Sequence, residues 1–292
     1  MGVAMYSILS HNKHVEKISF FVIDNHISKE NREKLNTVIE QFDNADIRFI
    51  NFNLFENKLH LNLTWPISLS SYARLFVGEM LPDDINRVLY LDCDIVVNDS
   101  LVELWNTNLK YHCLGAVQDT IPTKTKAAVG LTPHQRYFNA GVLLIDLQRW
   151  REMKIGQKCL DFIDSHNGQV VHHDQGVLNG ILKEQWVRLP LTNNVMTILY
   201  MMSPFKIKKF YKDNSSYYDS EVIEDATKNP VILHFTPSLT SHPWEMNCAH
   251  PMRDLYLKNR DCTPWKGFPQ AKDPNPLYVR LINLRYRYLP IF

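Results

Sequence analysis

The sequence predicts an α/β fold in which helices cover both faces of a doubly wound, mostly parallel sheet. Short apolar runs, typical of buried strands, alternate with segments whose apolar residues recur at helical spacing. Over the first third of the chain the order is β-α-β-α-β, which favours parallel neighbours in one sheet. A pair of aspartates directly follows the third of these strands, at the position where α/β sheets bind ligands.

The elements of this first third can be justified one by one. In chain order they are a strand at 17–24, a helix from Ser28, a strand at 47–52, a helix at 70–80 and a strand at 87–91. The first and last strands are continuous apolar runs, as in strands buried on both faces, while the middle strand alternates. Ser28 is a good N-cap, and Leu35, Val38 and Ile39 behind it share one helical face.

Beyond residue 94 the pattern is less regular, but further elements can still be assigned. Strands are expected at 114–117, 141–145 and 231–234, and helices at 155–165 and 175–182. Residues 204–220 are rich in lysine, tyrosine and serine, which predicts a surface loop.

Composition excludes several classes of protein. A chain of 292 residues can bury a substantial core, and its net charge of +1 argues against broad electrostatic capture of nucleic acid. The five cysteines are dispersed without a CxxC pair, which favours a reduced, cytoplasmic protein. No apolar run has the length of a membrane span, and the first residues lack the basic region of a signal peptide.

Two carboxylates, Asp92 and Asp94, form the strongest local signal for chemistry. Paired carboxylates at the end of a strand are hard oxygen ligands, which suit Mg²⁺ or Mn²⁺. A metal held by both can bridge a diphosphate and neutralise it as a leaving group. The alternative is that both are ordinary turn residues, since aspartate is common in turns.

Two other polar features are candidates for the same site. His234 ends the strand at 231–234, and its neutral imidazole suits a third metal ligand, with a purely structural histidine as the alternative. His173, Asp174, Gln175 and Gly176 precede a helical run. Asp174 is either the N-cap of that helix or, with the amide of Gln175, a partner for sugar hydroxyls.

Five ordered segments resemble glycosyltransferase family 8, most closely its bacterial lipopolysaccharide galactosyl- and glucosyltransferases, which are related to glycogenin. The segments are GVAMYSIL at 2–9, ISLSSYARL at 67–75, RVLYLDCD at 87–94, YFNAGVLLI at 137–145 and HDQGVLN at 173–179. His234, followed by Pro243 and Trp244, matches the closing motif of the family. Five motifs in order are far more specific than any one alone.

The resemblance implies a GT-A fold with a mixed, Rossmann-like sheet, and a retaining transfer of galactose or glucose from UDP-galactose or UDP-glucose. It implies that Asp92, Asp94 and His234 hold a Mn²⁺ or Mg²⁺ ion. The positions that surround the donor sugar in the family are Arg74, Asp119, Asn139, Ala140, Asp174 and Gln175. Gln175 and Asp174 are the catalytic candidates, at the anomeric carbon and the sugar hydroxyls. Because glutamine is a poor nucleophile, a front-face displacement is expected.

Two departures from the family pattern accompany the resemblance. The family has a strand and a turn with an acidic residue and a tyrosine ahead of Gly2. The sheet is therefore expected to lack its first, central strand, through a late start codon or truncation. His242 stands where the family carries a lysine on the diphosphate, in a loop that is longer here. Histidine can donate to phosphate but is mostly neutral at pH 7.

The expected organisation is a catalytic domain at 1–255 and a basic, aromatic tail at 256–292. Residues 274–292 contain no acid and carry Arg280, Arg285 and Arg287. They either lie at a membrane surface, near a glycan or lipid-linked saccharide acceptor, or pack as a helix on the domain. Residues 193–204 match an acceptor-side loop of the family, with core packing as the alternative for their methionines.

Three functions remain open from the sequence. The first is a hexosyltransferase of lipopolysaccharide or cell-surface polysaccharide biosynthesis. A metal-dependent nucleotidyltransferase or phosphohydrolase also uses paired aspartates, but it needs a basic triphosphate loop near the N-terminus, which the sequence does not show. The third is an inactive remnant or a sugar-nucleotide-binding module without turnover.

Overall fold

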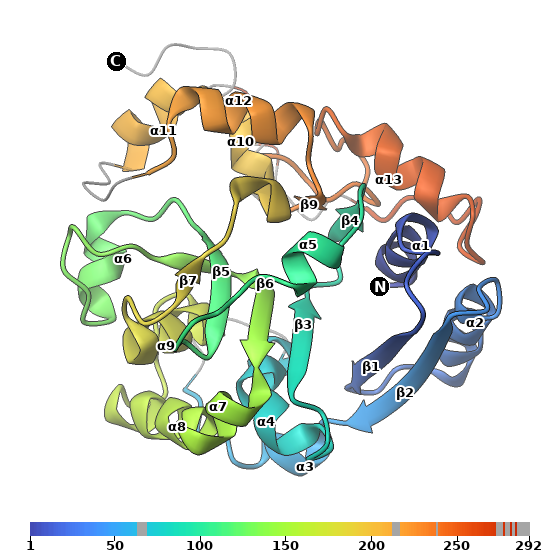
Figure 1. Ribbon diagram of the computed structural model, residues 1–292. Coiled ribbons are helices and arrows are strands. Elements are labelled where there is room, and N and C mark those ends of the chain that lie inside the picture. Colours follow the sequence, from blue (N-terminus) through green and yellow to red (C-terminus); the bar gives the residue numbers. More distant parts are fainter. Residues whose placement is uncertain are drawn as a thin grey trace.

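The strands of the computed structural model form separate sheets with helices packed around them (Figure 1). The structure describes residues 1–62, 69–211, 217–237 and 239–272, together with Leu277, Leu281 and Leu284. Within these residues no helix is both long and apolar enough to cross a membrane. The arginines of the tail, Arg280, Arg285 and Arg287, lie outside the described residues.

The N-terminal unit consists of α1 (Gly2–His11), β1 (Ile18–Asp24), α2 (Lys29–Ile39) and β2 (Ala45–Asn51). β1 and β2 are parallel and pair from Ile18 with Ala45 to Asp24 with Asn51, as the alternation of elements predicted. The expected N-cap is confirmed, because the Ser28 hydroxyl accepts a hydrogen bond from the Asn31 N–H at 3.3 Å.

The segment expected as one helix at 70–80 is mostly a 3₁₀ helix. After α3 (Asn53–Glu56), η1 (Leu69–Phe76) leads into α4 (Val77–Met80). The five residues from Tyr72 to Phe76 are all buried, so this segment turns no face to solvent. It therefore delivers Arg74 into the interior of the molecule.

The central sheet has the strand order β3 (Arg87–Leu91), β6 (Phe138–Asp146), β5 (Leu114–Gln118) and β7 (Val187–Arg188). β6 is antiparallel to both β3 and β5, so the expectation of a mostly parallel sheet is wrong here and the mixed sheet of the GT-A fold is confirmed. Residues 119–137 connect the end of β5 to the start of β6, so the chain returns to the same end of the sheet. There the Asp119 N–H donates to the Tyr137 carbonyl at 2.8 Å.

A third sheet carries His234, at the end of one of its strands, and begins directly after Asp94. Its order is β4 (Ile95–Val97), β9 (Ile232–His234) and β8 (Val195–Met196). β4 and β9 are antiparallel, with Ile95 opposite His234, and the Phe235 N–H donates to the Asp94 carbonyl at 2.8 Å. This pairing places the end of β9 beside the turn that follows β3.

The remaining helices surround these sheets. They are α5 (Val102–Trp105), α6 (Thr123–Ala128), α7 (Leu147–Glu152), α8 (Ile155–Ser165), α9 (His173–Leu182), η2 (Leu191–Asn193), α10 (Thr197–Met201), α11 (Pro204–Tyr211), α12 (Ser220–Lys228) and α13 (Arg253–Arg260). The prediction of a loop at 204–220 is wrong, because α11 occupies its first part and is anchored by the buried Ile207. Residues 212–216 of that range lie outside the described residues.

The break between β1 and β3 divides what would otherwise be one sheet. β1 pairs only with β2, and β3 only with β6, among the described strands. Their side chains nevertheless belong to the same two apolar layers. Phe20 and Leu89 pack on one hydrophobic cluster, and Phe21 and Val88 pack on another. The resemblance to glycosyltransferase family 8 implies a further strand between β1 and β3.

Helix α1 connects the N-terminal unit to β4 through buried polar contacts. The Ser7 hydroxyl donates to the Ala4 carbonyl at 2.8 Å and accepts from the Val97 N–H at 3.0 Å. The Asn12 side chain accepts from the Leu101 N–H at 2.8 Å. Both side chains are almost completely buried, so water cannot replace these bonds.

Ser7→Ala should lower the free energy of unfolding by about 1–3 kcal/mol, because the buried Val97 N–H loses its acceptor. Urea denaturation followed by circular dichroism measures the change. The control is Ser10→Ala in the same helix, where the hydroxyl donates to the Ser7 carbonyl at 3.1 Å, and a change below about 0.5 kcal/mol is expected. Equal losses for the two variants would contradict this account of the α1–β4 contact.

Candidate active site

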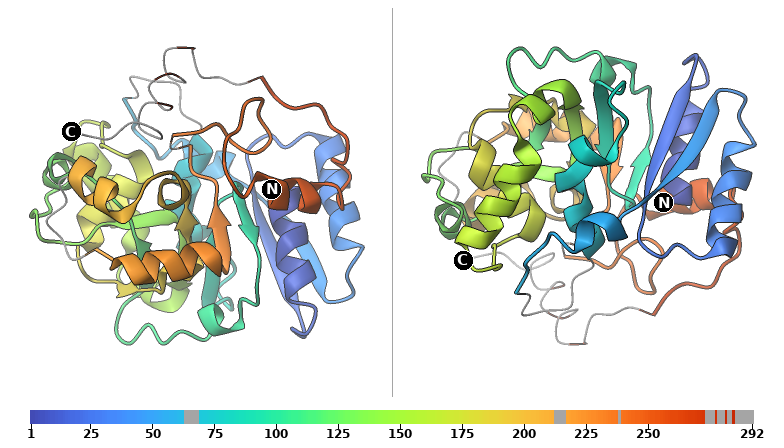
Figure 2. Two further views of the ribbon diagram at one scale, coloured as in Figure 1. Left: turned by 90° about the horizontal axis from the view of Figure 1, so that it is seen from above. Right: turned by 90° about the horizontal axis from the view of Figure 1, so that it is seen from below.

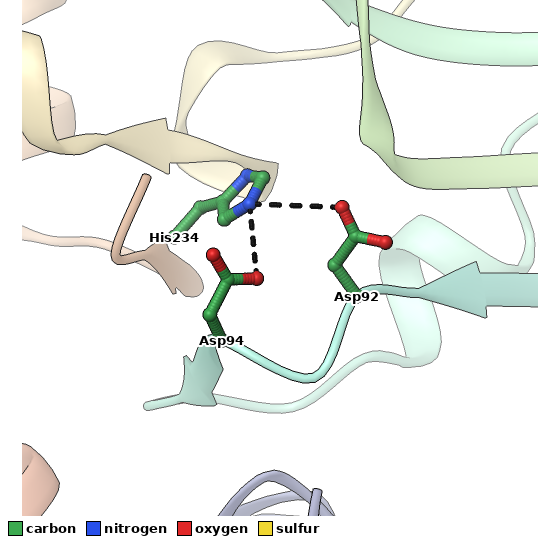
Figure 3. Close-up of side chains that lie close together, drawn as sticks. All are labelled: Asp92, Asp94 and His234. Carbon is green, nitrogen blue, oxygen red and sulfur yellow. Dashed lines mark ion pairs between the residues drawn. The ribbon is translucent and has the colours of Figure 1, made fainter. Parts of the chain in front are cut away.

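Asp92, Asp94 and His234 converge at the junction of the central and third sheets (Figure 3). His234 Nε2 lies 3.3 Å from Asp94 Oδ1 and 3.8 Å from Asp92 Oδ2. One ligand atom from each residue lies within 4.8 Å of the other two. Two carboxylates and one imidazole are a donor set that suits Mn²⁺ or Mg²⁺, so these residues fit the expected metal.

Hydrogen bonding prepares His234 for this role. Its Nδ1 is hydrogen-bonded to Asn194 Oδ1 at 2.9 Å, and its Nε2 faces the two carboxylates. Burial lowers the pKa of His234, but Asp94 and then Asp92 outweigh burial, and the net shift is upward. For Asp94, burial raises the pKa, but the charge of His234, its hydrogen bond and the charge of His242 together outweigh burial, so the net shift is downward.

Gly141 on β6 gives these side chains their space. A Cβ at this position would lie 2.1 Å from His234 Cε1 and 2.9 Å from Asp92 Oδ2. The Gly141 carbonyl also accepts a hydrogen bond from the Asp92 N–H at 2.8 Å. This bond fixes the start of the acidic turn, residues 92–94 between β3 and β4. The glycine of the NAG sequence in β6 is therefore required by the close approach of the site residues.

A single guanidinium, that of Arg74, joins the metal-binding candidates to Asp174. Its Nη2 lies 2.8 Å from Asp92 Oδ1 and its Nε lies 2.8 Å from Asp174 Oδ2. Nη1 donates to the Ala140 carbonyl, and the Tyr90 ring lies 4.5 Å from the guanidinium carbon. Burial opposes the charge on Arg74, but Asp174 and Asp92 outweigh burial and raise its pKa.

Asp174 is held in place by an unusual backbone at the start of α9. His172 and His173 both have positive φ angles, 60° and 55°, which are uncommon for residues with a side chain. A Cβ on Gly176 would lie 1.9 Å from the Val171 carbonyl oxygen, so the turn folds back tightly on the helix. The strained turn aims Asp174 at Arg74 and excludes it from solvent.

The other donor-sugar candidates form a hydrogen-bonded group beside this ion pair. Asp119 Oδ2 accepts from Gln175 Nε2 at 2.9 Å and from Asn139 Nδ2 at 3.1 Å. Gln175 Oε1 accepts from the Ala140 N–H at 3.0 Å. Asn139 Oδ1 accepts from Asn194 Nδ2 at 2.9 Å, which links this group to His234.

His242, in the loop that follows β9, also lies close to Asp94. Its Nε2 is 3.8 Å from Asp94 Oδ2, and its ring stacks on Trp244 with centroids 4.4 Å apart. Glu245 fixes this loop, because its carboxylate accepts from the His242 N–H at 2.8 Å. Trp244 also borders a cavity of about 400 Å³ that is lined by Met1, Gly2, Ile27, Tyr256 and Trp265, among others.

The structure brings all ten predicted site residues into one continuous arrangement. Sequence reasoning missed Asn194 and Tyr90, which position other side chains. Asn194 lay in the segment matched to an acceptor-side loop, and a lone amide there has no sequence signature. Its methionine neighbours Met196, Met201 and Met202 are buried, as the core-packing alternative expected.

The mixed sheet, with carboxylates, a histidine and a cluster of amides at its strand ends, matches the GT-A fold that the resemblance to glycosyltransferase family 8 implies. A comparison with solved structures agrees: the galactosyltransferase LgtC, in complex with donor and acceptor sugar analogs, superposes with a TM-score of 0.72 and 28% identity, covering 90% of this chain and 91% of that one. The sequence profile of glycosyl transferase family 8 matches residues 1–248, and the chain belongs to that family.

Two relatives span most of this chain. A lipopolysaccharide 1,2-glucosyltransferase of Escherichia coli K12 is 27% identical over 99% of this chain and 80% of its own length. General stress protein A of Bacillus subtilis is 28% identical over 91% of this chain and 90% of its own length.

Gly141→Ala should weaken Mn²⁺ binding by at least about tenfold, because the new methyl group displaces His234 or Asp92. Isothermal titration calorimetry measures the affinity, and circular dichroism checks that the fold is kept. Gly156→Ala is the control, since its Cβ would crowd Glu79 instead, away from the acidic turn. Unchanged affinity in Gly141→Ala would show that Mn²⁺ does not bind at these side chains.

Asp174 should make folding depend on pH. Burial raises its pKa to about 6, against the opposing effect of Arg74, from an ordinary value of 3.8. The folded protein therefore binds this proton more tightly than the unfolded chain. The resulting stabilisation is present below about pH 4 and is lost as the pH rises through about 6.

Asp174→Asn removes that titration. Between about pH 4 and 6, wild-type protein should lose on the order of 3 kcal/mol of unfolding free energy relative to the variant. Urea denaturation at several pH values gives the two curves. Parallel curves would show that Asp174 titrates normally in the folded protein.

Proposed function

We propose that the chain is a metal-dependent, retaining hexosyltransferase that moves galactose or glucose from a UDP-sugar to a glycan acceptor in lipopolysaccharide or cell-surface polysaccharide biosynthesis. The observation that carries the proposal is the placement of Asp92, Asp94 and His234 directly beside the polar group around Asp119 and Gln175. A diphosphate and a hexose require these two neighbouring environments. The relatives with sugar-transfer names support the same reading.

Asp92, Asp94 and His234 would hold the ion, which supplies charge neutralisation for a diphosphate leaving group. His242 lies beside Asp94 and offers an imidazole N–H to a phosphate oxygen in place of the lysine of the family. The neighbouring cavity has indole walls from Trp244 and Trp265, which suit a nucleobase. Uridine, diphosphate and sugar would thus follow one another from the cavity through the acidic turn to Gln175.

The residues near the sugar act by position and charge. Asp119 and Asp174 offer carboxylate oxygens to sugar hydroxyls, and Arg74 compensates the charge of Asp174 and of Asp92 at once. The Gln175 amide is fixed at both ends by Asp119 and the Ala140 N–H. A fixed amide is a weak nucleophile but a good dipole, so the front-face displacement fits this geometry better than a covalent enzyme intermediate.

Release of UDP from UDP-galactose and UDP-glucose in the presence of Mn²⁺ tests the proposal, because slow hydrolysis of the donor needs no acceptor. Asp92→Asn and Asp94→Asn should each lower the rate by roughly 100-fold or more, since the carboxylates that hold the ion are lost. Asp99→Asn is the matched control: it removes an exposed carboxylate just beyond β4 and should leave the rate unchanged.

Gln175→Ala in the same assay examines the role of the amide, and an unchanged rate would remove Gln175 from the mechanism. No UDP release and no metal-dependent binding of UDP by the wild-type chain would favour the remnant or binding module instead. A nucleotidyltransferase or phosphohydrolase would be indicated by release of UMP or of phosphate.

A further inference from the structure

Helix α11 turns an aromatic and basic face away from the molecule. Ile207 is 1% exposed and belongs to a hydrophobic core cluster, so it fixes the rotation of the helix. Phe205, two positions earlier, points to the opposite side and is 74% exposed. Lys208, three residues after Phe205, shares its outward face and is exposed. A phenylalanine and a lysine therefore lie next to each other on the outward face of α11.

The charged side chains of this helix all have one sign. α11 contains Lys206, Lys208 and Lys209, and the sequence has no aspartate or glutamate from Gln185 to Lys212. Phe210, at the end of α11, is a second partly exposed aromatic side chain. Lysines around an aromatic side chain match the boundary of an anionic bilayer, where phosphates meet acyl chains. An acidic protein surface would satisfy the lysines but would leave Phe205 without an apolar environment.

The position of α11 relates this face to the candidate active site. Tyr211, the last residue of α11, packs on the same hydrophobic cluster as Val117 of β5, and Asp119 follows directly after this strand. Beyond the helix, the Thr120 hydroxyl donates to the Tyr217 hydroxyl at 2.8 Å. Figures 1 and 2 show α11 at the end of the molecule opposite α8, towards the viewer in the view from above.

We propose that α11 docks the protein on an anionic lipid surface. Phe205 enters the interface between headgroups and acyl chains, and Lys206 and Lys208 lie against lipid phosphates. This contact brings the Asp119 side of the candidate site close to the bilayer, where a lipid-linked acceptor would present its sugar. The membrane contact does not depend on the identity of the donor, so binding to vesicles tests it separately from sugar transfer.

Co-sedimentation of the full chain with vesicles provides the test. Vesicles of phosphatidylcholine and phosphatidylglycerol in equal parts should bind the wild-type protein, and pure phosphatidylcholine should bind it much more weakly. Phe205→Ala should reduce binding by roughly tenfold through the lost apolar contact. Lys206→Glu with Lys208→Glu should reduce it by at least roughly tenfold through charge reversal.

Two variants serve as matched controls. Tyr111→Ala removes a side chain that is 91% exposed elsewhere on the surface, and Lys158→Glu reverses an exposed charge on α8. Both should bind vesicles as the wild type does. The α11 variants should keep the wild-type rate of UDP release in solution, because Phe205, Lys206 and Lys208 do not belong to the candidate site.

The proposal is overturned if wild-type protein does not bind the phosphatidylglycerol vesicles, or binds pure phosphatidylcholine equally well. Equal binding by the α11 variants and the wild type would also overturn it. A chain shortened by residues 274–292 separates the two possible contacts. If this deletion alone abolishes binding while the α11 variants bind fully, the membrane contact belongs to the tail and not to α11.

Discussion

The buried guanidinium of Arg74 is the interaction on which the candidate site depends. It touches the end of β3 through Asp92, the start of α9 through Asp174 and the middle of β6 through the Ala140 carbonyl. A buried cation is costly unless carboxylates and carbonyls surround it, and here they come from three different elements. The planar fork of arginine can serve all three at once, which the single ammonium of lysine cannot do. The demand for partners around Arg74 therefore fixes the separation between the metal-binding candidates and the sugar-binding candidates.

Neutral amides complete this arrangement without adding charge. From His234 the hydrogen bonds run through Asn194 and Asn139 to Asp119, and then through Gln175 to the Ala140 N–H. Each amide both donates and accepts, so its orientation is determined by its neighbours. A chain of this kind is rigid because turning one amide would leave several buried groups unsatisfied. Preorganised dipoles are what a displacement with developing charge requires.

Much of this architecture could be predicted from local patterns, and the exceptions have physical reasons. The apolar run at Arg87–Leu91 and the helix at Ile155–Ser165 were predicted with their observed bounds, because burial and helical periodicity leave direct marks in sequence. The direction of β6 could not be predicted, since an apolar run looks the same in a parallel and an antiparallel sheet. α11 could not be predicted, since lysine, tyrosine and serine are also common in loops and one apolar residue, Ile207, does not define a helical face. The convergence of His234 with the aspartates depends on the pairing of β4 with β9, which no local pattern specifies, and it was expected only from the family resemblance.

β1 and β3 share no ladder of hydrogen bonds, so opening the N-terminal unit should cost less than opening a strand inside a continuous sheet. Cross-strand bonds would make the two sheets exchange their amide protons as one cooperative block, whereas here the attachment runs through shared apolar side chains and through the contacts of α1 with β4. Amides of β1 and β2 are then expected to exchange through a local opening, at lower cost than those of β5 and β6. Gly2, Ile27 and Leu35 of this unit line the cavity that Trp244 borders. Such an opening would therefore remove one wall of the cavity beside the metal-binding candidates.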